Sequence, residues 1–185
     1  PELSRGLGDV YKRQIIILSD RKTSKKYAPI PILLVCSYVH HSLIKRKKRS
    51  KFGIVIESAE PREPHHFSML FGFGASAINP YMVNEIIEYH HKLGFLNEQK
   101  LDKSIDNFNK AIAKGILKVM NKIGISTLHS YRGAQIFEAL GLRKKFVNKY
   151  FNNTPSRIEG AGLYVLEKEV SSRMDYALNL SLIHI

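Results

Sequence analysis

The stretch that decides the fold is residues 53–80, GIVIESAEPREPHHFSMLFGFGASAINP. It begins with a short apolar run, Gly53–Ile56, which predicts a strand. Glu63–Phe71 has the spacing of a helix, and Ala75–Ile78 is a second short apolar run. Asn79, which is followed by proline, is typical of a helix N-cap. Strand, helix and strand in this order predict a βα unit of a parallel sheet.

The same alternation continues on both sides of this stretch. Upstream, Ile15–Leu18 predicts the first strand, and the prolines at positions 29 and 31 introduce a helix with one apolar face. Downstream, the sequence predicts a helix to about His91, an amphipathic helix that ends at Gly124, a fourth strand over Ile125–Leu128, helices over Gly133–Leu140 and Arg143–Tyr150, a loop over Asn152–Gly162 and a last helix over Leu163–Leu178.

Four strands without a closing partner predict an α/β fold, in which alternating βα units form a mainly parallel sheet. Two arrangements stay open, part of a TIM-barrel-like fold or part of a doubly wound sheet. We expect residues 15–180 to form this α/β region. The ends, residues 1–14 and 181–185, are expected to be non-native or disordered, with the natural protein continuing beyond them.

The composition limits the class of protein. The 185 residues carry a formal charge of +13 and are 44% apolar, which excludes wholesale disorder and allows a core of ordinary size. The longest weakly polar run, residues 27–39, is shorter than the roughly 20 residues that a bilayer span needs. A single cysteine, Cys36, excludes an internal disulfide and a cysteine-ligated iron–sulfur cluster within this chain, and it fits a reducing cytoplasm.

Polar residues follow the predicted strands. In parallel βα folds the carboxyl ends of the strands meet at one edge of the sheet, where ligands are contacted. The candidate site residues are Asp20, Glu57, Glu60, Arg62, Asn79, Ser130 and Arg132. Two interpretations stay open: a polar rim that faces a partner domain or a channel, or helix caps and local ion pairs with a structural role.

Three further patterns have both a chemical and a structural interpretation. Residues 57–66 combine three carboxylates, a guanidinium and two imidazoles, which suits either acid–base chemistry and metal binding or an ion-pair network. Gly72–Ala77 satisfies the G-x-G-x-x-G/A dinucleotide fingerprint, but the expected helix before it and strand after it reverse the order that binds a pyrophosphate. Cys36 and His40, four residues apart, are either an activated thiolate pair or part of the core.

A basic run, residues 45–51, carries six positive charges in seven positions. Such a run either stays solvated at the end of a helix or binds nucleic acid by releasing counterions. No zinc spacing or helix-turn-helix pattern accompanies it. An autonomous basic nucleic-acid-binding module is therefore the alternative function.

A series of motifs occurs in order over about residues 15–178. They are Ile17–Arg21, Ala28–Pro31 with Val39–His41, Glu57–Glu63, His65–Phe67, Gly72–Ala75, Ala77–Tyr81, Lys114–Met120, Gly124–Leu128, Ser130–Ala139 and Ser156–Gly160. Together they resemble the central domain of the glutamate synthase large chain. Departures are local: Ala59, Pro61 and Pro64 interrupt the Glu-Ser-Gly-Glu-Ala-Arg-Glu-Val pattern of that family, and His129 replaces a glutamine.

The resemblance implies an internal scaffold segment that lies between a glutamine amidotransferase domain and an FMN-binding domain. In such a parent chain, ammonia released from glutamine passes through a tunnel. The imine that it forms with 2-oxoglutarate is reduced to glutamate at an FMN barrel that also carries a 3Fe-4S cluster. The segment itself is expected to bind no cofactor and to be inactive alone. It would help to form the tunnel and to couple the domains, with the seven candidate residues facing a neighbouring domain or the tunnel.

The resemblance also implies the partners. They are the neighbouring amidotransferase and FMN domains of the parent chain and, through the parent, a small NADPH-oxidising subunit or ferredoxin. Neither a membrane nor a nucleic acid is expected as a partner. The implied location is the cytoplasm, or a plastid if the parent is of the ferredoxin type.

Overall fold

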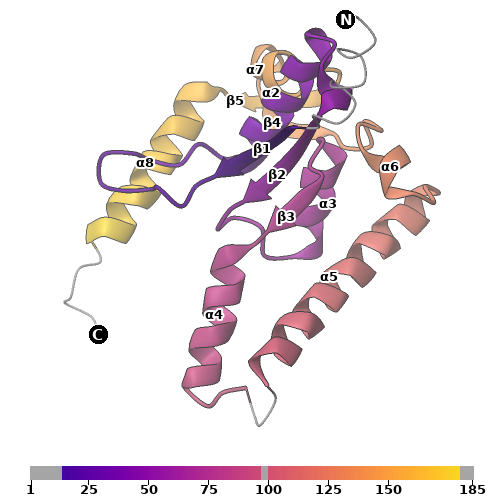
Figure 1. Cartoon of the computed structure of the whole chain (residues 1–185). Helices are drawn as coiled ribbons and strands as arrows, with labels where there is room; N and C mark the ends of the chain where they lie inside the picture. Colours follow the sequence, from indigo (N-terminus) through magenta and orange to yellow (C-terminus); the bar gives the residue numbers. More distant parts are fainter. Residues whose placement is uncertain (1–13, 97–99, 180–185) are drawn as a thin grey trace, which may run out of the picture.

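The computed structural model of the chain describes residues 14–96 and 100–179 (Figure 1). The predicted non-native ends, residues 1–14 and 181–185, lie outside the described residues apart from Gln14, with which the first strand begins. Among the described helices, none combines the length and the hydrophobicity that a membrane span requires.

The main sheet has three parallel strands, in the order β1-β2-β3. They are β1 (Gln14–Ser19), β2 (Phe52–Glu57) and β3 (Ala77–Asn79). In the register, Ile17 pairs with Val55, which pairs with Ala77 on its other side. The connections between the strands contain α2 (Ile32–Lys45) and α3 (Pro64–Gly72). The βα units predicted from residues 53–80 are therefore confirmed.

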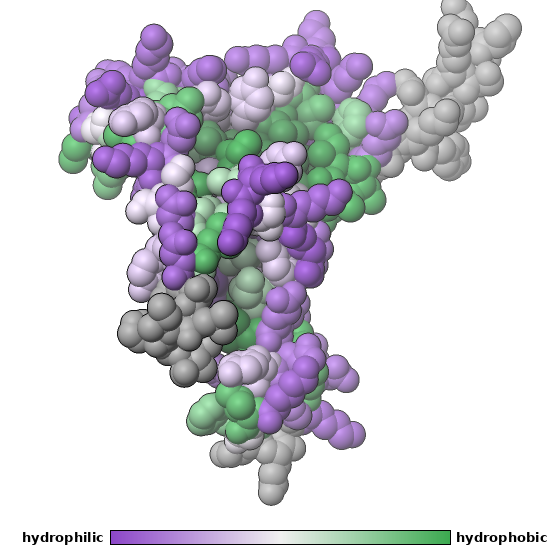
Figure 2. All heavy atoms as spheres, turned by 90° about the vertical axis from the view of Figure 1, so that its left-hand side faces the viewer, coloured by the Kyte–Doolittle hydropathy of each residue, from purple (hydrophilic) through white to green (hydrophobic). Residues whose placement is uncertain are grey.

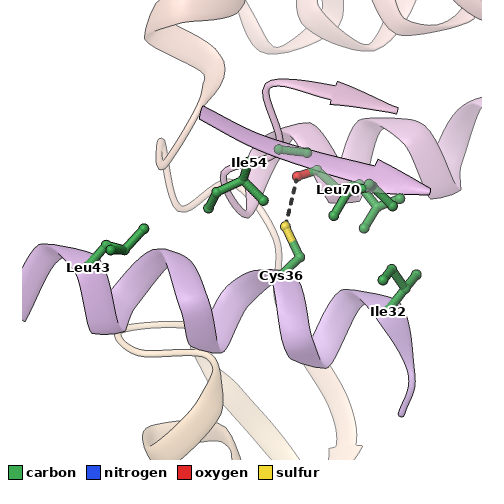
Figure 3. Packing of buried hydrophobic residues seen from close by; sticks show 7 residues of the cluster. Ile32, Cys36, Leu43, Ile54 and Leu70 are labelled. Carbon is green, nitrogen blue, oxygen red and sulfur yellow. Dashed lines mark hydrogen bonds between the residues drawn. The ribbon is translucent and has the colours of Figure 1, made fainter. Parts of the chain in front are cut away.

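One face of the main sheet forms the core. Ile54 and Ile56 of β2 are fully buried there, and they pack with Ile32 and Cys36 of α2 and with Leu70 of α3 (Figure 3). The other face carries the alternate residues of the strands, because successive side chains in a strand point to opposite sides. We name this the outer face and define it by Ile15, Ile17, Val55 and Ala77.

A second, smaller sheet lies in the C-terminal part. It consists of the parallel strands β4 (Ala139–Leu142) and β5 (Ser156–Ala161), with α7 (Lys144–Tyr150) between them and α8 (Leu163–Asn179) after them. Phe146, Val147 and Phe151 pack against Leu34 of α2, which joins this unit to the main sheet. In the described part of the chain the two sheets stay separate and no barrel is closed.

Three predicted elements in this region are wrong. The helix expected over Gly133–Leu140 does not form, since this range is irregular up to its last two residues, with which β4 begins. The loop expected over Asn152–Gly162 contains β5. Both strands are largely exposed and contain glycine, so they lack the apolar alternation from which strands are predicted. The strand expected over Ile125–Leu128 is absent, because Thr127 caps the short helix α6 (Leu128–Tyr131) by accepting from the N–H of Ser130.

Two long helices extend away from the main sheet, at the end where β3 finishes (Figure 1). They are α4 (Tyr81–Lys92) and α5 (Leu101–Ile123), and α5 returns along α3, where Phe108 contacts Phe67. Gly124 ends α5 in the left-handed conformation, as predicted. Asn79 is the last residue of β3, where its carbonyl accepts from the N–H of Ser58, so the predicted N-cap role falls instead to Pro80.

Candidate functional site

Asp20 ties the ends of β1 and β2 together. It directly follows β1, and its backbone N–H donates to the carbonyl of Glu57 at 3.2 Å. Its carboxylate accepts from the hydroxyl of Ser58 at 2.6 Å and from the backbone N–H of Ala59 at 3.1 Å. Parallel strands end at one edge of a sheet, so a single short side chain after β1 can fix the loop that leaves β2.

Glu57, the last residue of β2, is the centre of a second group of hydrogen bonds. One carboxylate oxygen accepts from the hydroxyl of Ser19 at 2.7 Å, and the other accepts from the Nε of Arg21 at 2.8 Å. The hydrogen bond from Ser19 lowers the pKa of Glu57 most. The hydrogen bonds from Arg21 and Asn79 lower this pKa further. The carboxylate therefore stays ionised and acts as an acceptor.

Glu60 supplies the missing cap of a helix. Its carboxylate accepts from the N–H of Ile32, the first residue of α2, at 3.1 Å, while Pro31 at the N-cap position offers no side-chain cap. A negative charge at this end also interacts favourably with the helix dipole. Burial raises the pKa of Glu60. Arg62 is exposed nearby, and its backbone N–H donates to the Nδ1 of His66 at 3.3 Å.

Two residues at this edge, Tyr81 and Glu85, were missed by the sequence analysis. The Nη1 of Arg21 lies 3.2 Å from the carboxylate of Glu85, and its guanidinium carbon lies 4.0 Å from the centre of the Tyr81 ring. Tyr81 also hydrogen-bonds to Asp20, and burial, together with this bond, raises the pKa of Tyr81 to about 12. Both residues belong to the start of α4, where a spacing of four residues places them on one helix face.

The structure brings together four of the seven predicted site residues. We name Asp20, Glu57, Glu60 and Asn79 the strand-end cluster, and the charge of Arg62 also acts on Glu60. The cluster holds loops and a helix end in place through hydrogen bonds to each of its three carboxylates. Among the described residues, no group of three His, Cys, Asp or Glu side chains is placed to hold a metal ion.

Ser130 and Arg132 do not join this cluster. They were expected behind a fourth strand, and that strand is replaced by α6, at the opposite end of the main sheet (Figure 1). The N–H of Ser130 donates to the hydroxyl of Thr127 at 3.3 Å, so Ser130 belongs to the cap of α6. The Nη1 of Arg132 lies 3.4 Å from the hydroxyl of Ser76, just before β3 begins. The expectation that all seven residues share one edge is therefore wrong for these two.

Cys36 is a core residue rather than half of a catalytic pair. Its thiol is fully buried and points to the carbonyl oxygens of Leu70 at 3.9 Å and Phe73 at 3.6 Å (Figure 3). Burial raises the pKa of Cys36 to about 12. The Nδ1 of His40 accepts a hydrogen bond from the Nε of Arg49 at 2.8 Å, so this nitrogen is not available to take a proton from the thiol.

Cys36 should therefore resist alkylation in the folded chain. We expect iodoacetamide at pH 8 to modify it about 1,000-fold more slowly than in the unfolded chain, because only the thiolate reacts and burial suppresses it. The rate is measured by mass spectrometry with and without 6 M guanidinium chloride. A His40→Gln variant is the control, since a thiolate pair would lose reactivity in it. Labelling of the native chain at the rate of a free thiol would contradict the assignment.

The glycines of Gly72–Ala77 serve packing. As expected, α3 precedes them and β3 follows, so no helix N-terminus is presented to a pyrophosphate. Gly74 has a φ of 110° and lies against the His40 ring, where a Cβ atom would come within 2.3 Å of its Nδ1. The sequence therefore needs glycine here for both the backbone conformation and the close approach.

The basic run at residues 45–51 is divided between surface and interior. Most of its side chains are exposed at the end of α2, as a solvated run would be. Arg49 turns inward and donates to His40, to the carbonyl of Phe52 at 2.6 Å and to the carbonyl of Gly74 at 2.7 Å. One of the six charges is thus used inside the molecule.

These features define an α/β protein of the parallel-sheet class with a fixed polar cluster at the strand ends. Residues 8–143 match the model of the glutamate synthase central domain. The match includes the whole main sheet and extends to the end of β4. The chain belongs to the glutamate synthase central domain family.

Curated relatives agree with this assignment. The chain is 39% identical to the glutamate synthase [NADPH] large chain of Bacillus subtilis over 181 residues, which are 93% of this chain and 12% of the relative. It is 40% identical to the glutamate synthase [NADH] of Saccharomyces cerevisiae, over 86% of this chain and 8% of that protein. It is also 40% identical to the ferredoxin-dependent glutamate synthase of Antithamnion sp., over 84% of this chain and 11% of that protein. The chain thus spans about an eighth, or less, of these relatives.

Proposed function

We propose that this chain is an internal scaffold segment of a glutamate synthase large chain. It would lie between the glutamine amidotransferase domain and the FMN-binding domain, help to form the ammonia tunnel and couple the two reactions. In the parent, FMN and the 3Fe-4S cluster would be held by other domains, and glutamate would be made there from glutamine and 2-oxoglutarate. The electron donor would be a small NADPH-oxidising subunit or ferredoxin. The relatives favour this role over the alternative of a nucleic-acid-binding module.

The observation that carries the proposal is the exposure of apolar side chains on the outer face of the main sheet. Ile15 and Ile17 are 68% and 62% exposed there, although they lie in the middle of a strand and not in a loop. Apolar side chains of this size gather on an open surface where another protein surface packs against it. Exposed hydrophobic residues, mixed with hydrophilic ones, are also visible in the upper half of the side shown in Figure 2. A neighbouring domain of the parent chain would cover the outer face.

The strand-end cluster supports the same role. It is charged, held by hydrogen bonds and located at the edge next to the outer face, since Ser19, Glu57 and Asn79 follow Ile17, Val55 and Ala77 in the register. Its carboxylates are fixed acceptors and Cys36 is buried, so these residues offer structure and charge. Asp20, Glu57, Glu60, Arg62 and Asn79 are the residues that we propose to face the neighbouring domain or the tunnel.

A chimera tests this function. This chain replaces the matching segment in the large chain of Bacillus subtilis, and glutamine hydrolysis and glutamate formation are measured in the same assay. We expect the chimera to couple the two reactions. An Ile17→Lys substitution, which puts a charge into the covered face, should raise the glutamine hydrolysed per glutamate formed by about tenfold, the effect of about 1.4 kcal/mol.

The matched control is Leu117→Lys in the same chimera. Leu117 is 61% exposed, close to the 62% of Ile17, but it lies on α5 away from the outer face, so coupling should stay unchanged. An Ile17→Lys chimera that couples as well as the unsubstituted one would refute the role of the outer face. Glutamate formation by the isolated chain would refute the scaffold function as a whole.

A further inference from the structure

A pocket of about 400 Å³ lies at the other end of the main sheet from the strand-end cluster. It is bounded by α2, by the glycine loop after α3 and by two loop segments, residues 132–135 and 152–153. Its volume is within the range of small-molecule sites. Nothing in the proposed scaffold function uses this pocket.

The wall of the pocket is rich in hydrogen-bond donors. It contains the guanidinium of Arg132 and the amide groups of Gln135, Asn152 and Asn153, and it contains no carboxylate. The Nε of Arg132 is buried and has no hydrogen-bond partner among the described residues. An unpaired buried donor costs free energy, and more so when it is charged. This atom therefore indicates a missing acceptor.

A second guanidinium fixes the orientation of His40 in the same wall. The Nε of Arg49 donates to the Nδ1 of His40 at 2.8 Å, and its other two nitrogens donate to backbone carbonyls. Because Nδ1 of the neutral ring accepts, Nε2 carries the proton. Nε2 lies on the side of Gly133, where a Cβ atom would be 3.7 Å from it. His40 thus presents an N–H toward the pocket wall that Gly133 helps to form.

The charges around the pocket have one sign. Burial lowers the pKa of His40 to about 4, and the nearby Arg49, His41 and Arg132 act in the same direction. Burial and the charge of Arg132 also lower the pKa of Arg49. Within the described part of the chain, neither arginine forms an ion pair with a carboxylate. Two partly buried guanidinium groups without a counter-charge favour an anion.

The backbone supplies an independent observation. Only three non-glycine residues of the described chain have a left-handed φ, and two of them, Gln135 with 55° and Asn153 with 61°, line this pocket. Such conformations persist where the surrounding structure enforces them, and they concentrate at ligand sites. Both residues place amide side chains at the pocket from opposite loop segments.

We propose that this pocket binds a small molecule or ion that carries an oxyanion, a phosphate or a carboxylate. The guanidinium of Arg132 and the Nε2 of His40 would donate to the oxygens, and the amides of Asn152 and Asn153 would complete the shell. Arg49 is a positioning residue, because it holds the tautomer of His40 and keeps the local potential positive. The glycine loop lets the side chains of His40 and Arg49 approach its backbone closely at Gly74.

Calorimetric titration of the 185-residue chain tests the proposal. Inorganic phosphate and acetate are added separately at pH 7, with sodium chloride holding the ionic strength constant, so that the two arms distinguish a phosphate from a carboxylate ligand. We expect saturable binding of one anion per chain for at least one of them. NMR titration of His40 should show that its pKa rises when the anion is bound, since the bound charge favours the protonated ring.

Three variants decide whether the binding is at this pocket. Arg132→Gln should weaken binding at least tenfold, while Arg46→Gln, which removes the same charge from the exposed end of α2, should leave it unchanged. Asn153→Gly keeps the left-handed backbone, removes the amide and should weaken binding severalfold, so it decides the case if Arg132→Gln fails to fold. Equal weakening by Arg132→Gln and Arg46→Gln would show general surface attraction only. Either that result or no saturation with either anion would overturn the proposal.

Discussion

Gly74→Ala is expected to lower the free energy of unfolding by about 3 to 5 kcal/mol, because two unfavourable effects act at one position. The φ of 110° is strained for any residue with a Cβ atom. In addition, the new Cβ would lie 2.3 Å from the Nδ1 and 2.9 Å from the Cβ of His40. His40 cannot move away easily, since its ring is held by Arg49 and its Cβ is bonded to the backbone of α2.

Urea unfolding followed by circular dichroism measures this loss. Gly94→Ala is the matched control, because Gly94 also has a positive φ, 75°, but nothing lies within 4 Å of its added Cβ. This control should lose about 1 kcal/mol, the cost of the backbone conformation alone. Equal losses in the two variants would show that the contact between Gly74 and His40 does not exist in the folded chain.

The elements that the sequence predicts correctly are those with one buried face. β1, β2 and β3 are recognisable because Ile54, Ile56 and their neighbours form apolar runs against α2. β4 and β5 are not, because they expose Leu140 and Ile158 and contain glycines. Periodicity reports burial, so it fails where a strand is held mainly by its hydrogen bonds.

The residues of the candidate site were placed correctly only where the strands before them were predicted correctly. Asp20, Glu57 and Asn79 come together because parallel strands in register end at one edge, which the order of elements already predicts. Ser130 and Arg132 were placed by a strand that does not form, because Thr127 caps a helix there instead. The role of Arg49 was hidden, since a single inward-facing charge within a basic run has no signature in the sequence.

The two sites lie at opposite ends of the main sheet and differ in charge. The strand-end cluster gathers carboxylates that are already paired with donors. The pocket near Arg132 gathers donors, one of which lacks an acceptor. The first arrangement is complete within the chain, and the second requires something from outside it.

Ile56→Ala is expected to lower the free energy of unfolding by about 2 to 5 kcal/mol. Ile56 is fully buried and pairs with Leu18 on one side and Ile78 on the other, and its side chain packs in the cluster with Ile32 and Cys36. Removing most of this side chain leaves a cavity that the neighbouring strands cannot fill without breaking their register. The midpoint of urea unfolding measures the loss, with an unchanged slope as the sign of two-state behaviour.

Ile17→Ala, on the opposite face of the same sheet, is the matched control. It removes the same atoms from a strand residue, but the side chain is 62% exposed, so the isolated chain should lose less than about 1 kcal/mol. The contrast separates the face that folds this chain from the face that we propose a neighbouring domain to cover. If Ile17→Ala destabilises the isolated chain as strongly as Ile56→Ala, the outer face is already packed within this chain. The coupling defect expected for Ile17→Lys in the chimera would then have to be assigned to unfolding.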